Sequence, residues 1–400
     1  MTDLLTLEDL DLGRLAGQRV FVRVDFNVPL SPVGEVLDTT RLEEALPTLR
    51  ELAAAGARLI LASHCGRPKG EPDPLCSLRP VAPALARLLG EEVAFAADCV
   101  GEEAAAAVAA LAPQRMLLLE NLRFHPGETK NDPGFAAQLA ALADAYVDDA
   151  FGSAHRAHAS VVGIVERLQR KAAGRLMERE VAALGRLLGE PQRPFAALLG
   201  GAKIEGKIDT LSNLLPRLDL LLVGGGMANT FLAAQGHDMA ASLVEADRLE
   251  LARDILGRAA GRGVRVELPS DLVATDDLAA PRRVETVAAD QVPAGMKAVD
   301  IGPASRHRFA AAIASARTLF WNGPMGVFER PPFDAGTREL ARALAACPGF
   351  SVIGGGETVA AARQAGVIGR IGHVSTGGGA ALEFLAGKTL PGVAVLERHP

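Results

Sequence analysis

The feature that most constrains the fold is the alternation of short apolar runs with longer amphipathic stretches. The runs are RVFVRVDF, RLILAS, RMLLLEN and AYVDDAF in the first half of the chain, and FAALLGG, DLLLVGG, VRVELPS, TLFWNGP and FSVIGGG in the second. Runs this short and this apolar are typical of strands buried on both faces, as in parallel sheets. Helical patterns such as TTRLEEALPTLRELAAAG lie between them, with Thr39 or Thr40 as the expected cap and Gly56 as the expected end. The sequence therefore predicts an α/β fold of doubly wound, Rossmann-like parallel sheets.

The length of the chain and the grouping of the runs indicate two domains. A chain of 400 residues exceeds the usual size of a single core. The two sets of predicted strands are separated by residues 163–193, which are polar on one side and carry Leu, Met and Val on the other. We interpret this stretch as an amphipathic helical connector. We expect an N-terminal domain over residues 1–172 and a C-terminal domain over residues 173–389, with a hinge helix at about 173–190.

Composition excludes several classes of protein. The chain is 49% hydrophobic and 22% charged, which is typical of a globular protein. Its net charge of −6 argues against general nucleic-acid binding, and an aromatic content of 4% leaves few side chains for base stacking. Any anionic ligand must therefore be held by a local cluster of basic residues.

Cysteine usage and hydropathy indicate the compartment. The four cysteines are Cys65, Cys76, Cys99 and Cys347, and none forms a Cys-x-x-Cys pair. This sparse distribution favours a reducing environment. The start of the sequence, MTDLLTLEDL, lacks the basic residues of a signal peptide, and the most apolar stretch is interrupted by glycines. We expect a cytoplasmic protein without membrane or nucleic-acid partners.

Polar and basic side chains follow the predicted strands of the first half, at the point where each strand ends. They are Asp25 and Asn27, His64 and Arg67, Arg123, and Arg156, while Arg41 at a helix start is placed to join them. Ligands of α/β sheets bind at the carboxyl ends of strands. Forked guanidinium donors match phosphate and carboxylate oxygens, so the sequence predicts an anion site here. For Asp25 and Asn27 an ordinary turn before Pro29 is the alternative.

The stretch AHRAHAS, residues 154–160, allows a second interpretation. His155 and His158 are spaced so that they could share a zinc ion with Asp148 or Asp149. The neighbouring arginines would repel a cation, so we favour an anion with Arg156 as its ligand. For His155 a structural hydrogen bond and a ligand contact remain equal alternatives.

Glycine-rich loops follow strands of the second half. Residues 201–207 fit most of a phosphate-binding loop, but Ile208 stands where a metal-binding Ser or Thr belongs. We expect Lys203 and Lys207, four residues apart, to lie on one face of a helix start and to hold a polyphosphate. The partial dinucleotide fingerprint in VGGGMAN has Asn229 in place of its third glycine, which makes it weak evidence.

The stretch VIGGGETV predicts a second phosphate loop, in which a helix opens with Glu357 and Thr358. A carboxylate would repel a phosphate beside it unless a cation lay between them, and Mg²⁺ is the natural candidate. In the alternative interpretation, Glu357 only satisfies the helix N-terminus. HVSTGGGAALEFL has the same arrangement, in which a run of glycines leads into a helix.

Taken together and in this order, the motifs resemble those of the phosphoglycerate kinase family. They are VDFNVP, SHCGRP, ENLRF, AFGSAHRAHAS, GGAKIEGKI, GGGMANTFL, FWNGPMGVFE, VIGGGETV and HVSTGGGAALEFLAGK, and they extend from about residue 20 to the end of the chain. The resemblance implies reversible phosphoryl transfer between 1,3-bisphosphoglycerate and ADP, giving 3-phosphoglycerate and ATP, as in glycolysis and gluconeogenesis. It also implies hinge-bending closure, a monomer, and a C-terminal segment, residues 390–400, that returns to the first domain.

By position, the resemblance implies roles for particular residues. It assigns binding of the glycerate ligand to Asp25, Phe26, Asn27, Arg41, His64, Gly66, Arg67, Arg123 and Arg156. It assigns binding of the nucleotide to Lys207, Ala298, Asn322, Glu329, Gly355, Gly356, Glu357 and Thr358. Arg41 and Lys203 would be catalytic, and Glu357 would hold Mg²⁺ with the nucleotide phosphates, directly or through water.

The chain departs from the family pattern at three positions. Glu357 stands where the family usually has Asp, Cys65 replaces a usual Leu or Met, and Ala298 replaces a Gly that lines the adenine pocket of many members. The first change is expected to shift the metal, the second to alter packing, and the third to tighten the pocket wall. The alternative functions are an NAD-dependent dehydrogenase, which rests on VGGGMAN alone, and a non-catalytic anion-binding protein.

Overall fold

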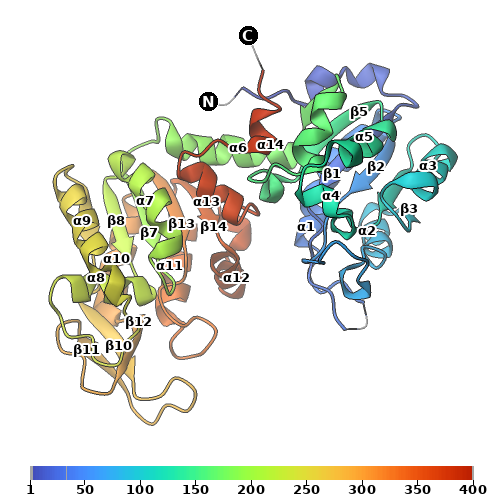
Figure 1. Ribbon diagram of the computed structural model, residues 1–400. Helices are drawn as coiled ribbons and strands as arrows, with labels where there is room; N and C mark the ends of the chain where they lie inside the picture. Colours follow the sequence, from blue (N-terminus) through green and yellow to red (C-terminus); the bar gives the residue numbers. More distant parts are fainter. Residues whose placement is uncertain (1–2, 33, 399–400) are drawn as a thin grey trace. The chain divides into compact units, whose positions relative to one another are not determined.

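The computed structural model describes residues 3–32 and 34–398, which form two compact units (Figure 1). Unit 1 extends to Ala182 and resumes at Thr389, and unit 2 is Ala183–Lys388. The boundary thus lies after Ala182, further along the chain than the expected residue 172. The reason is that the connecting helix begins inside unit 1, as described below.

Unit 1 is built on a six-stranded parallel sheet with the order β3-β4-β2-β1-β5-β6. Four strands lie in the predicted apolar runs: β1 (Arg19–Val24), β2 (Arg58–Ala62), β4 (Met116–Leu119) and β5 (Ala145–Asp149). The two edge strands, β3 (Val93–Ala96) and β6 (Lys171–Ala173), were not predicted. The helices are α1 (Thr40–Ala54), α2 (Val81–Leu89), α3 (Gly101–Ala110), α4 (Pro126–Thr129) and α5 (Pro133–Ala141).

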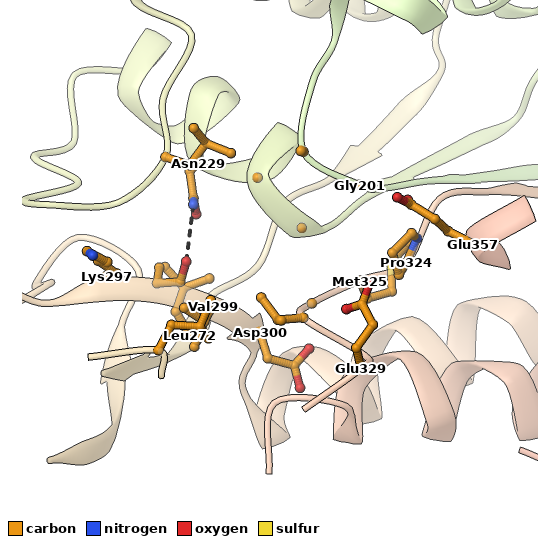
Figure 2. A pocket seen from close by; sticks show the side chains of 18 residues that line it. Gly201, Asn229, Leu272, Lys297, Val299, Asp300, Pro324, Met325, Glu329 and Glu357 are labelled. Atoms are coloured by element: carbon orange, nitrogen blue, oxygen red, sulfur yellow. Dashed lines mark hydrogen bonds between the residues drawn. The ribbon is translucent and has the colours of Figure 1, made fainter. Parts of the chain in front are cut away.

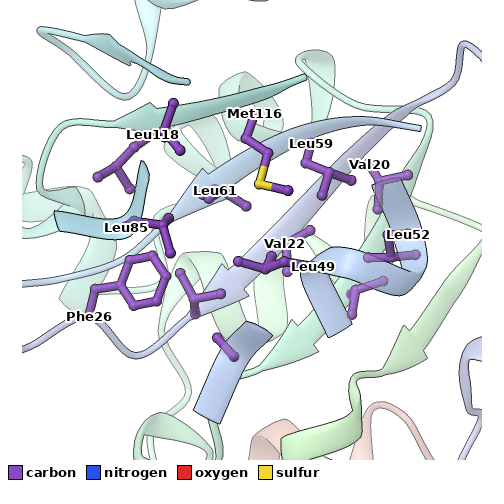
Figure 3. Packing of buried hydrophobic residues seen from close by; sticks show 14 of the residues in the cluster. Val20, Val22, Phe26, Leu49, Leu52, Leu59, Leu61, Leu85, Met116 and Leu118 are labelled. Atoms are coloured by element: carbon purple, nitrogen blue, oxygen red, sulfur yellow. The ribbon is translucent and has the colours of Figure 1, made fainter. Parts of the chain in front are cut away.

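The core of unit 1 shows why its strands are apolar throughout. On one face, Val20 and Val22 of β1 pack with Leu59 and Leu61 of β2 against α1 (Figure 3). On the other face, side chains such as Phe21, Ile60 and Tyr146 are also fully buried. Burial on both faces removes the alternation of polar and apolar residues that a half-exposed sheet would show.

Unit 2 contains a second six-stranded parallel sheet, with the order β15-β14-β13-β7-β8-β9. Its strands are β7 (Phe195–Leu199), β8 (Leu220–Val223), β9 (Arg265–Glu267), β13 (Thr318–Asn322), β14 (Phe350–Gly354) and β15 (His373–Val374). Its helices are α7 (Ile208–Leu214), α8 (Gly225–Ala234), α9 (Leu249–Ala260), α10 (Pro303–Ala314), α11 (Ala335–Ala346), α12 (Gly356–Gln364) and α13 (Gly379–Leu385). The predicted class, two doubly wound parallel-sheet domains, is confirmed.

A small antiparallel sheet in unit 2 was not predicted. It consists of β10 (Asp271–Thr275), β11 (Val284–Ala288) and β12 (Lys297–Ile301), in the order β11-β10-β12. Figure 1 shows these strands grouped at one end of the unit, apart from the parallel sheet. They form one wall of the pocket described below.

The connector of residues 163–193 is not one continuous helix, and the prediction is wrong in this detail. Short helical turns at Ala159–Gly163 and Val165–Arg167 lead into β6, and the helix proper is α6 (Arg175–Leu188). Helix α6 crosses the boundary between the units at Ala182. Its first turn is tied to unit 1, because Asp149 Oδ1 at the end of β5 accepts hydrogen bonds from the backbone N–H of Leu176 (2.8 Å) and Met177 (3.3 Å).

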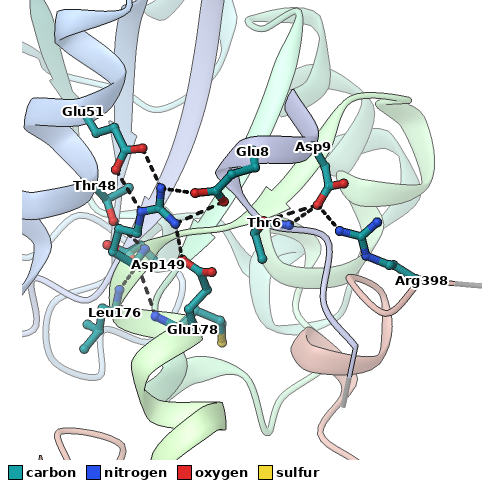
Figure 4. Close-up of polar contacts among 11 residues, drawn as sticks. Thr6, Glu8, Asp9, Thr48, Glu51, Asp149, Leu176, Glu178 and Arg398 are labelled. Atoms are coloured by element: carbon teal, nitrogen blue, oxygen red, sulfur yellow. Dashed lines mark hydrogen bonds and ion pairs between the residues drawn. The ribbon is translucent and has the colours of Figure 1, made fainter. Parts of the chain in front are cut away.

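Arg175 adds a second attachment of α6 to unit 1, through the carboxylates of Glu8 and Glu51 labelled in Figure 4. Its guanidinium lies 2.6 Å from carboxylate oxygens of Glu8 and of Glu51 in α1, and 2.8 Å from Glu178. Its backbone N–H donates to Thr48 Oγ1 at 2.8 Å. One side chain therefore joins the N-terminal segment, α1 and α6, and the start of α6 belongs to unit 1.

The last described residues also belong to unit 1. Helix α14 (Pro391–Ala394) is attached to unit 1 through its second residue, because the backbone N–H of Gly392 donates to Ala154 O at 2.8 Å. Leu5 N donates to Leu396 O at 2.8 Å, and Arg398 forms an ion pair with Asp9 at 2.7 Å (Figure 4).

Of the helices formed by the described residues, none combines the length and apolar character that a bilayer-spanning helix requires. All four cysteines are free thiols.

Candidate functional site

The first cluster of predicted site residues lies at one edge of the unit 1 sheet. Asp25 and Asn27 follow β1, His64 and Arg67 follow β2, Arg123 follows β4, and Arg156 follows β5. Strands β4, β2, β1 and β5 are consecutive neighbours, and all are parallel. Their carboxyl ends therefore meet at the same edge, and the loops that carry these side chains are adjacent.

Hydrogen bonds connect these loops. Arg41 Nη1 of α1 donates to Asp25 Oδ2 at 2.6 Å. Asn27 Oδ1 accepts from the backbone N–H of Gly66 at 2.9 Å, and Arg123 Nη1 donates to the carbonyl of Gly66 at 3.0 Å. Gly66 adopts φ 64°, in the left-handed region, and a Cβ there would meet Cys76 Sγ at 2.6 Å, so glycine is required. The three loops thus hold one another in place around the basic side chains.

His64 is oriented by a buried arginine that the sequence analysis did not single out. Arg23 on β1 is 0% exposed, and its guanidinium contacts Ser153 Oγ, Ser160 Oγ and the carbonyl of Val24. Arg23 Nη2 lies 3.2 Å from His64 Nδ1. Since arginine can only donate, Nδ1 is the acceptor, and a neutral His64 carries its proton on Nε2.

Positive charge accumulates in this cluster. Burial lowers the pKa of His64 well below its usual value, and the charges of Arg23, Arg123 and Arg41 lower it further. Burial also lowers the pKa of Arg123, with Arg23, Arg156 and Arg67 adding to the effect. Five guanidiniums therefore act on one region, which an anion would stabilise.

His158 forms part of the wall of this cluster. Its pKa is lowered to about 4, first by burial and then by Arg123 and Arg23, so it is neutral at pH 7. Its Nδ1 lies 3.7 Å from Glu128, whose carboxylate accepts hydrogen bonds from the backbone N–H and Oγ of Ser160. Within residues 3–32 and 34–398, no trio of His, Cys, Asp or Glu side chains spaced for a metal includes His155 or His158. The zinc interpretation therefore has no support in the geometry.

The second cluster surrounds a cavity of about 280 Å³ in unit 2 (Figure 2). Its walls come from the loops after β7 and β8, from β12, and from the loop after β13; lining residues include Gly201, Gly225, Gly226, Ala298, Glu329 and Glu357. Asn229 Nδ2 donates to the carbonyl of Ala298 at 3.4 Å, the hydrogen bond drawn as a dashed line at Asn229 in Figure 2. The glycines leave backbone groups exposed to the cavity. Asn229, which stands where a dinucleotide fingerprint would have its third glycine, contacts β12 instead.

The two lysines of the GGAKIEGK loop are arranged differently from the prediction. Lys203 is exposed on an irregular loop, while Lys207 precedes the first residue of α7. They do not share a helix face, because the backbone between them forms a separate short turn, Glu205–Lys207. Lys207 Nζ donates to the carbonyl of Gly200 at 2.6 Å, and burial lowers its pKa although Glu357 and Glu245 oppose the shift.

The loop between β14 and α12 has the predicted form. Gly355 has φ 90° and caps α12, whose first turn contains Glu357 and Thr358. Asn322 Nδ2 donates to the carbonyl of Gly354 at 2.8 Å, and Thr358 Oγ1 accepts from the backbone N–H of Gly323 at 2.6 Å. These two side chains hold the loops after β13 and β14 together, and Glu357 remains exposed at the helix N-terminus beside the cavity.

Comparison with known proteins identifies the family. A sequence profile described as phosphoglycerate kinase matches residues 7–388. The chain belongs to the phosphoglycerate kinase family. It is therefore an enzyme, a transferase that acts as a kinase in glycolysis, which excludes the dehydrogenase and the non-catalytic binding protein as alternatives.

Relatives agree with this assignment over nearly the whole chain. The phosphoglycerate kinase of Desulforudis audaxviator is 57% identical over 394 residues, which cover 98% of this chain and 99% of that protein. The phosphoglycerate kinase of Thermus thermophilus is 56% identical with the same coverage. Among solved structures, the phosphoglycerate kinase of Coxiella burnetii gives a TM-score of 0.89 at 39% identity, and covers 98% of each chain.

The structure also shows which members of the polar network sequence reasoning missed. Phe26 was predicted as a ligand contact, but the residue is 0% exposed and packs in the core. Its backbone N–H donates to Ser63 Oγ and its carbonyl accepts from Val28 N–H, so its role is to hold the loop after β1 in place. Arg23, Glu128, Ser153 and Ser160 were not predicted. A charged residue such as Arg23 within a strand buried on both faces requires buried partners, and this signal was available in RVFVRVDF.

Proposed function

We propose that the chain catalyses reversible phosphoryl transfer between 1,3-bisphosphoglycerate and ADP, giving 3-phosphoglycerate and ATP. The observation that carries the proposal is the pairing of two kinds of site in one chain of this family. Unit 1 has guanidiniums gathered at a sheet edge. Unit 2 has a glycine-lined cavity with Lys207 and a helix N-terminus beside it.

In this proposal, 3-phosphoglycerate binds at the basic cluster of unit 1. The phosphate and carboxylate oxygens of the ligand would accept hydrogen bonds from guanidiniums, at roughly 1.5–3 kcal/mol each. The proposed ligand-binding residues are Asp25, Asn27, Arg41, His64, Gly66, Arg67, Arg123 and Arg156. His64 would donate from Nε2, because Arg23 occupies Nδ1.

The nucleotide binds in unit 2. Ala298 and Glu329 line the cavity and would contact the base and the ribose, while Lys207 and the loop of Gly355 and Gly356 would hold phosphates. Asn322 and Thr358 would act by fixing that loop, since their side chains are engaged within the protein.

Magnesium fits the residues present at this end of the cavity. Glu357 is a carboxylate at a helix N-terminus that lines the cavity. It is close enough to Lys207 to oppose the lowering of that lysine's pKa by burial. Carboxylate and phosphate oxygens are the ligands that Mg²⁺ takes in kinases, so Glu357 would hold it directly or through water. Bound there, the ion would neutralise negative charge on the phosphate oxygens.

The transfer step requires positioning more than a covalent intermediate. The carboxylate of 3-phosphoglycerate is ionised at pH 7, so it can attack the γ-phosphorus of ATP in line without a general base. Arg41 and Lys203 would neutralise the charge on the phosphoryl group in transit. Lys203 is exposed on its loop, so its ammonium is accessible from solvent.

Because the acid and the nucleotide would bind in different units, transfer requires the units to close. Closure would also exclude water that hydrolyses an acyl phosphate. We assign the hinge to α6 and propose that unit 1, which extends to Ala182 and resumes at Thr389, acts as the glycerate domain. Unit 2, Ala183–Lys388, would act as the nucleotide domain. We place the protein in the cytoplasm as a monomer.

A coupled assay tests this function. The protein is supplied with 3-phosphoglycerate, ATP and Mg²⁺, and formation of 1,3-bisphosphoglycerate is followed by oxidation of NADH through glyceraldehyde-3-phosphate dehydrogenase. Turnover that depends on all three components is expected. Turnover with another phosphoryl acceptor in place of 3-phosphoglycerate, and none with 3-phosphoglycerate, would refute the proposal.

A further inference from the structure

A second cluster of chemically competent side chains lies in unit 1, outside the proposed glycerate site. Asp98 and Cys99 follow β3, and His125 follows the helical turn Leu122–Phe124 after β4. Strands β3 and β4 are parallel neighbours, so both loops leave the same edge of the sheet. One ligand atom from each of the three side chains lies within 4.8 Å of the others.

Asp98 is held in a fixed orientation. Its Oδ1 accepts hydrogen bonds from the backbone N–H of Cys99 (2.6 Å) and Val100 (3.4 Å), and lies 2.7 Å from His125 Nε2. These contacts all meet one oxygen, so the second oxygen, Oδ2, is not engaged in any of them. A carboxylate fixed through one oxygen to backbone amides loses little conformational entropy when it accepts a further ligand.

The other two side chains are also pre-oriented. The His125 ring stacks on Phe135, with centroids 5.3 Å apart, which fixes the plane of the imidazole. Cys99 is 0% exposed, whereas the side chains of His125 and Asp98 are 33% and 41% exposed. Cys99 is thus the buried member of the cluster, while His125 and Asp98 are half-buried and reachable from solvent.

The chemistry of the three groups selects one class of ion. Thiolate and imidazole are ligands of Zn²⁺ and Co²⁺, whereas Mg²⁺ and Ca²⁺ take oxygen. Three protein ligands with a fourth position open to water make up a tetrahedral site. We propose that Asp98, Cys99 and His125 form a binding site for a zinc-class divalent cation.

Binding at this site balances in charge and in protons. The ion replaces the proton of the Cys99 thiol, which passes to solvent. The proton that His125 Nε2 shares with Asp98 Oδ1 moves through solvent to Nδ1, so that Nε2 and Asp98 can each form a metal–ligand bond. The Cys99 thiolate and the Asp98 carboxylate together offset the two positive charges. No residue of the proposed glycerate or nucleotide sites takes part, so metal binding does not depend on the proposed function.

Co²⁺ is a suitable probe because its absorption spectrum reports the coordination geometry and the presence of a thiolate ligand. The full-length protein, free of any affinity tag, is titrated with CoCl₂ in the absence of nucleotide, and the absorption spectrum is recorded. We expect the visible bands of tetrahedral Co²⁺ and a thiolate-to-cobalt charge-transfer band, saturating at one ion per chain, and their loss when ZnCl₂ is added.

Three conservative variants separate the ligands. Asp98→Asn keeps the acceptor oxygen that the backbone amides use, and it removes the charge. Cys99→Ser removes the thiolate with little change in volume, and it should abolish the charge-transfer band. His125→Gln removes the imidazole. Each should weaken Co²⁺ binding by about tenfold or more, while the thermal midpoint of the metal-free protein shows that the variants are folded.

The matched controls are Cys347→Ser and His307→Gln, which lie in unit 2 and should leave the titration unchanged. The proposal is overturned if the wild-type protein gives octahedral Co²⁺ spectra only, or if the three variants bind as the wild type does. In either case the cluster is a His125–Asp98 hydrogen bond beside a buried thiol.

Discussion

At the scale of single residues, Arg67 offers a clear test of the glycerate site because its side chain is exposed. It can be removed without opening the core. Arg67→Ala should raise the KM for 3-phosphoglycerate by roughly tenfold or more, the value of one charge-assisted contact, and leave the KM for ATP unchanged. Steady-state kinetics with each substrate varied in turn measures both constants.

Lys69→Ala is the matched control, since Lys69 is an exposed cation on the same loop. It should leave both constants close to those of the wild type. An effect of Arg67→Ala confined to the KM for ATP would mean that the acid does not bind in unit 1.

Lys203 tests the transfer step. Because the proposal gives its ammonium a role only while the phosphoryl group is in transit, Lys203→Met should lower kcat by about 100-fold or more, with little change in either KM. Pre-steady-state quench-flow separates this loss from slow product release. Lys130→Met, an exposed lysine of unit 1, serves as the control; a Lys203→Met enzyme with normal kcat and a raised KM for ATP would make Lys203 a binding residue only.

The residues that sequence reasoning found and missed differ in a physical way. Arg67, Arg123 and Arg156 were predicted, because a basic side chain after an apolar strand stands out in the sequence. Glu128 and Ser160 were missed, because their contact at 2.6 Å joins segments that no local pattern relates. A sequence displays where charge is presented to a ligand, whereas partners that hold such charges in place become visible only with the fold.

At the scale of secondary-structure elements, the strands that sequence analysis predicted differ from those it missed in how completely they are buried. The inner strands of the parallel sheets are short apolar runs, and they were predicted. Strand β11 alternates exposed and half-buried residues, VETVA, and β6 has three residues, so neither gives a continuous apolar signal. Edge and partly exposed strands are specified mainly by their neighbours.

The junction of β5 with α6 makes stability depend on pH. Burial raises the pKa of Asp149 to about 6, although the Thr48 hydroxyl and the N–H groups of Met177 and Leu176 oppose the shift. From about pH 4 to 6 the folded state therefore holds more protons than the unfolded state, so this residue's contribution to stability falls as pH rises. Asp149→Asn keeps an oxygen that accepts from α6, and it cannot ionise. Between pH 4 and pH 7, its free energy of unfolding should therefore increase relative to that of the wild type by on the order of 1–3 kcal/mol.

Urea unfolding of both proteins across this pH range measures the difference. Asp149→Ala is the companion variant, because it also cannot ionise but loses the oxygen that accepts from Leu176 and Met177. It should be about 1–2 kcal/mol less stable than Asp149→Asn at every pH. A free-energy difference between wild type and Asp149→Asn that does not change with pH would show that Asp149 is ionised in the folded protein throughout.

At the scale of the whole molecule, each unit has its own hydrophobic core, and α6 is the helix that crosses from one to the other. Sequence analysis found the two units from the length and grouping of the strands. It placed the boundary too early, because the anchoring of α6 by Asp149 and Arg175 depends on contacts with β5, α1 and the N-terminal segment. The half of α6 beyond Ala182 is therefore where a hinge would bend.

Gly185 lies in that half of α6, and a Cβ at this position would meet nothing within 4 Å. Gly185→Ala should therefore stabilise the helix by about 0.5–1 kcal/mol. If α6 bends here during closure, the added helix stability must be overcome each time the units close. The kcat should then fall by up to about fivefold, while the thermal midpoint rises.

Gly257→Ala in α9 is the control, because Gly257 is an equally open glycine within a helix of unit 2. It should raise the midpoint and leave kcat unchanged, and an equal kcat in both variants would place the bend outside this part of α6.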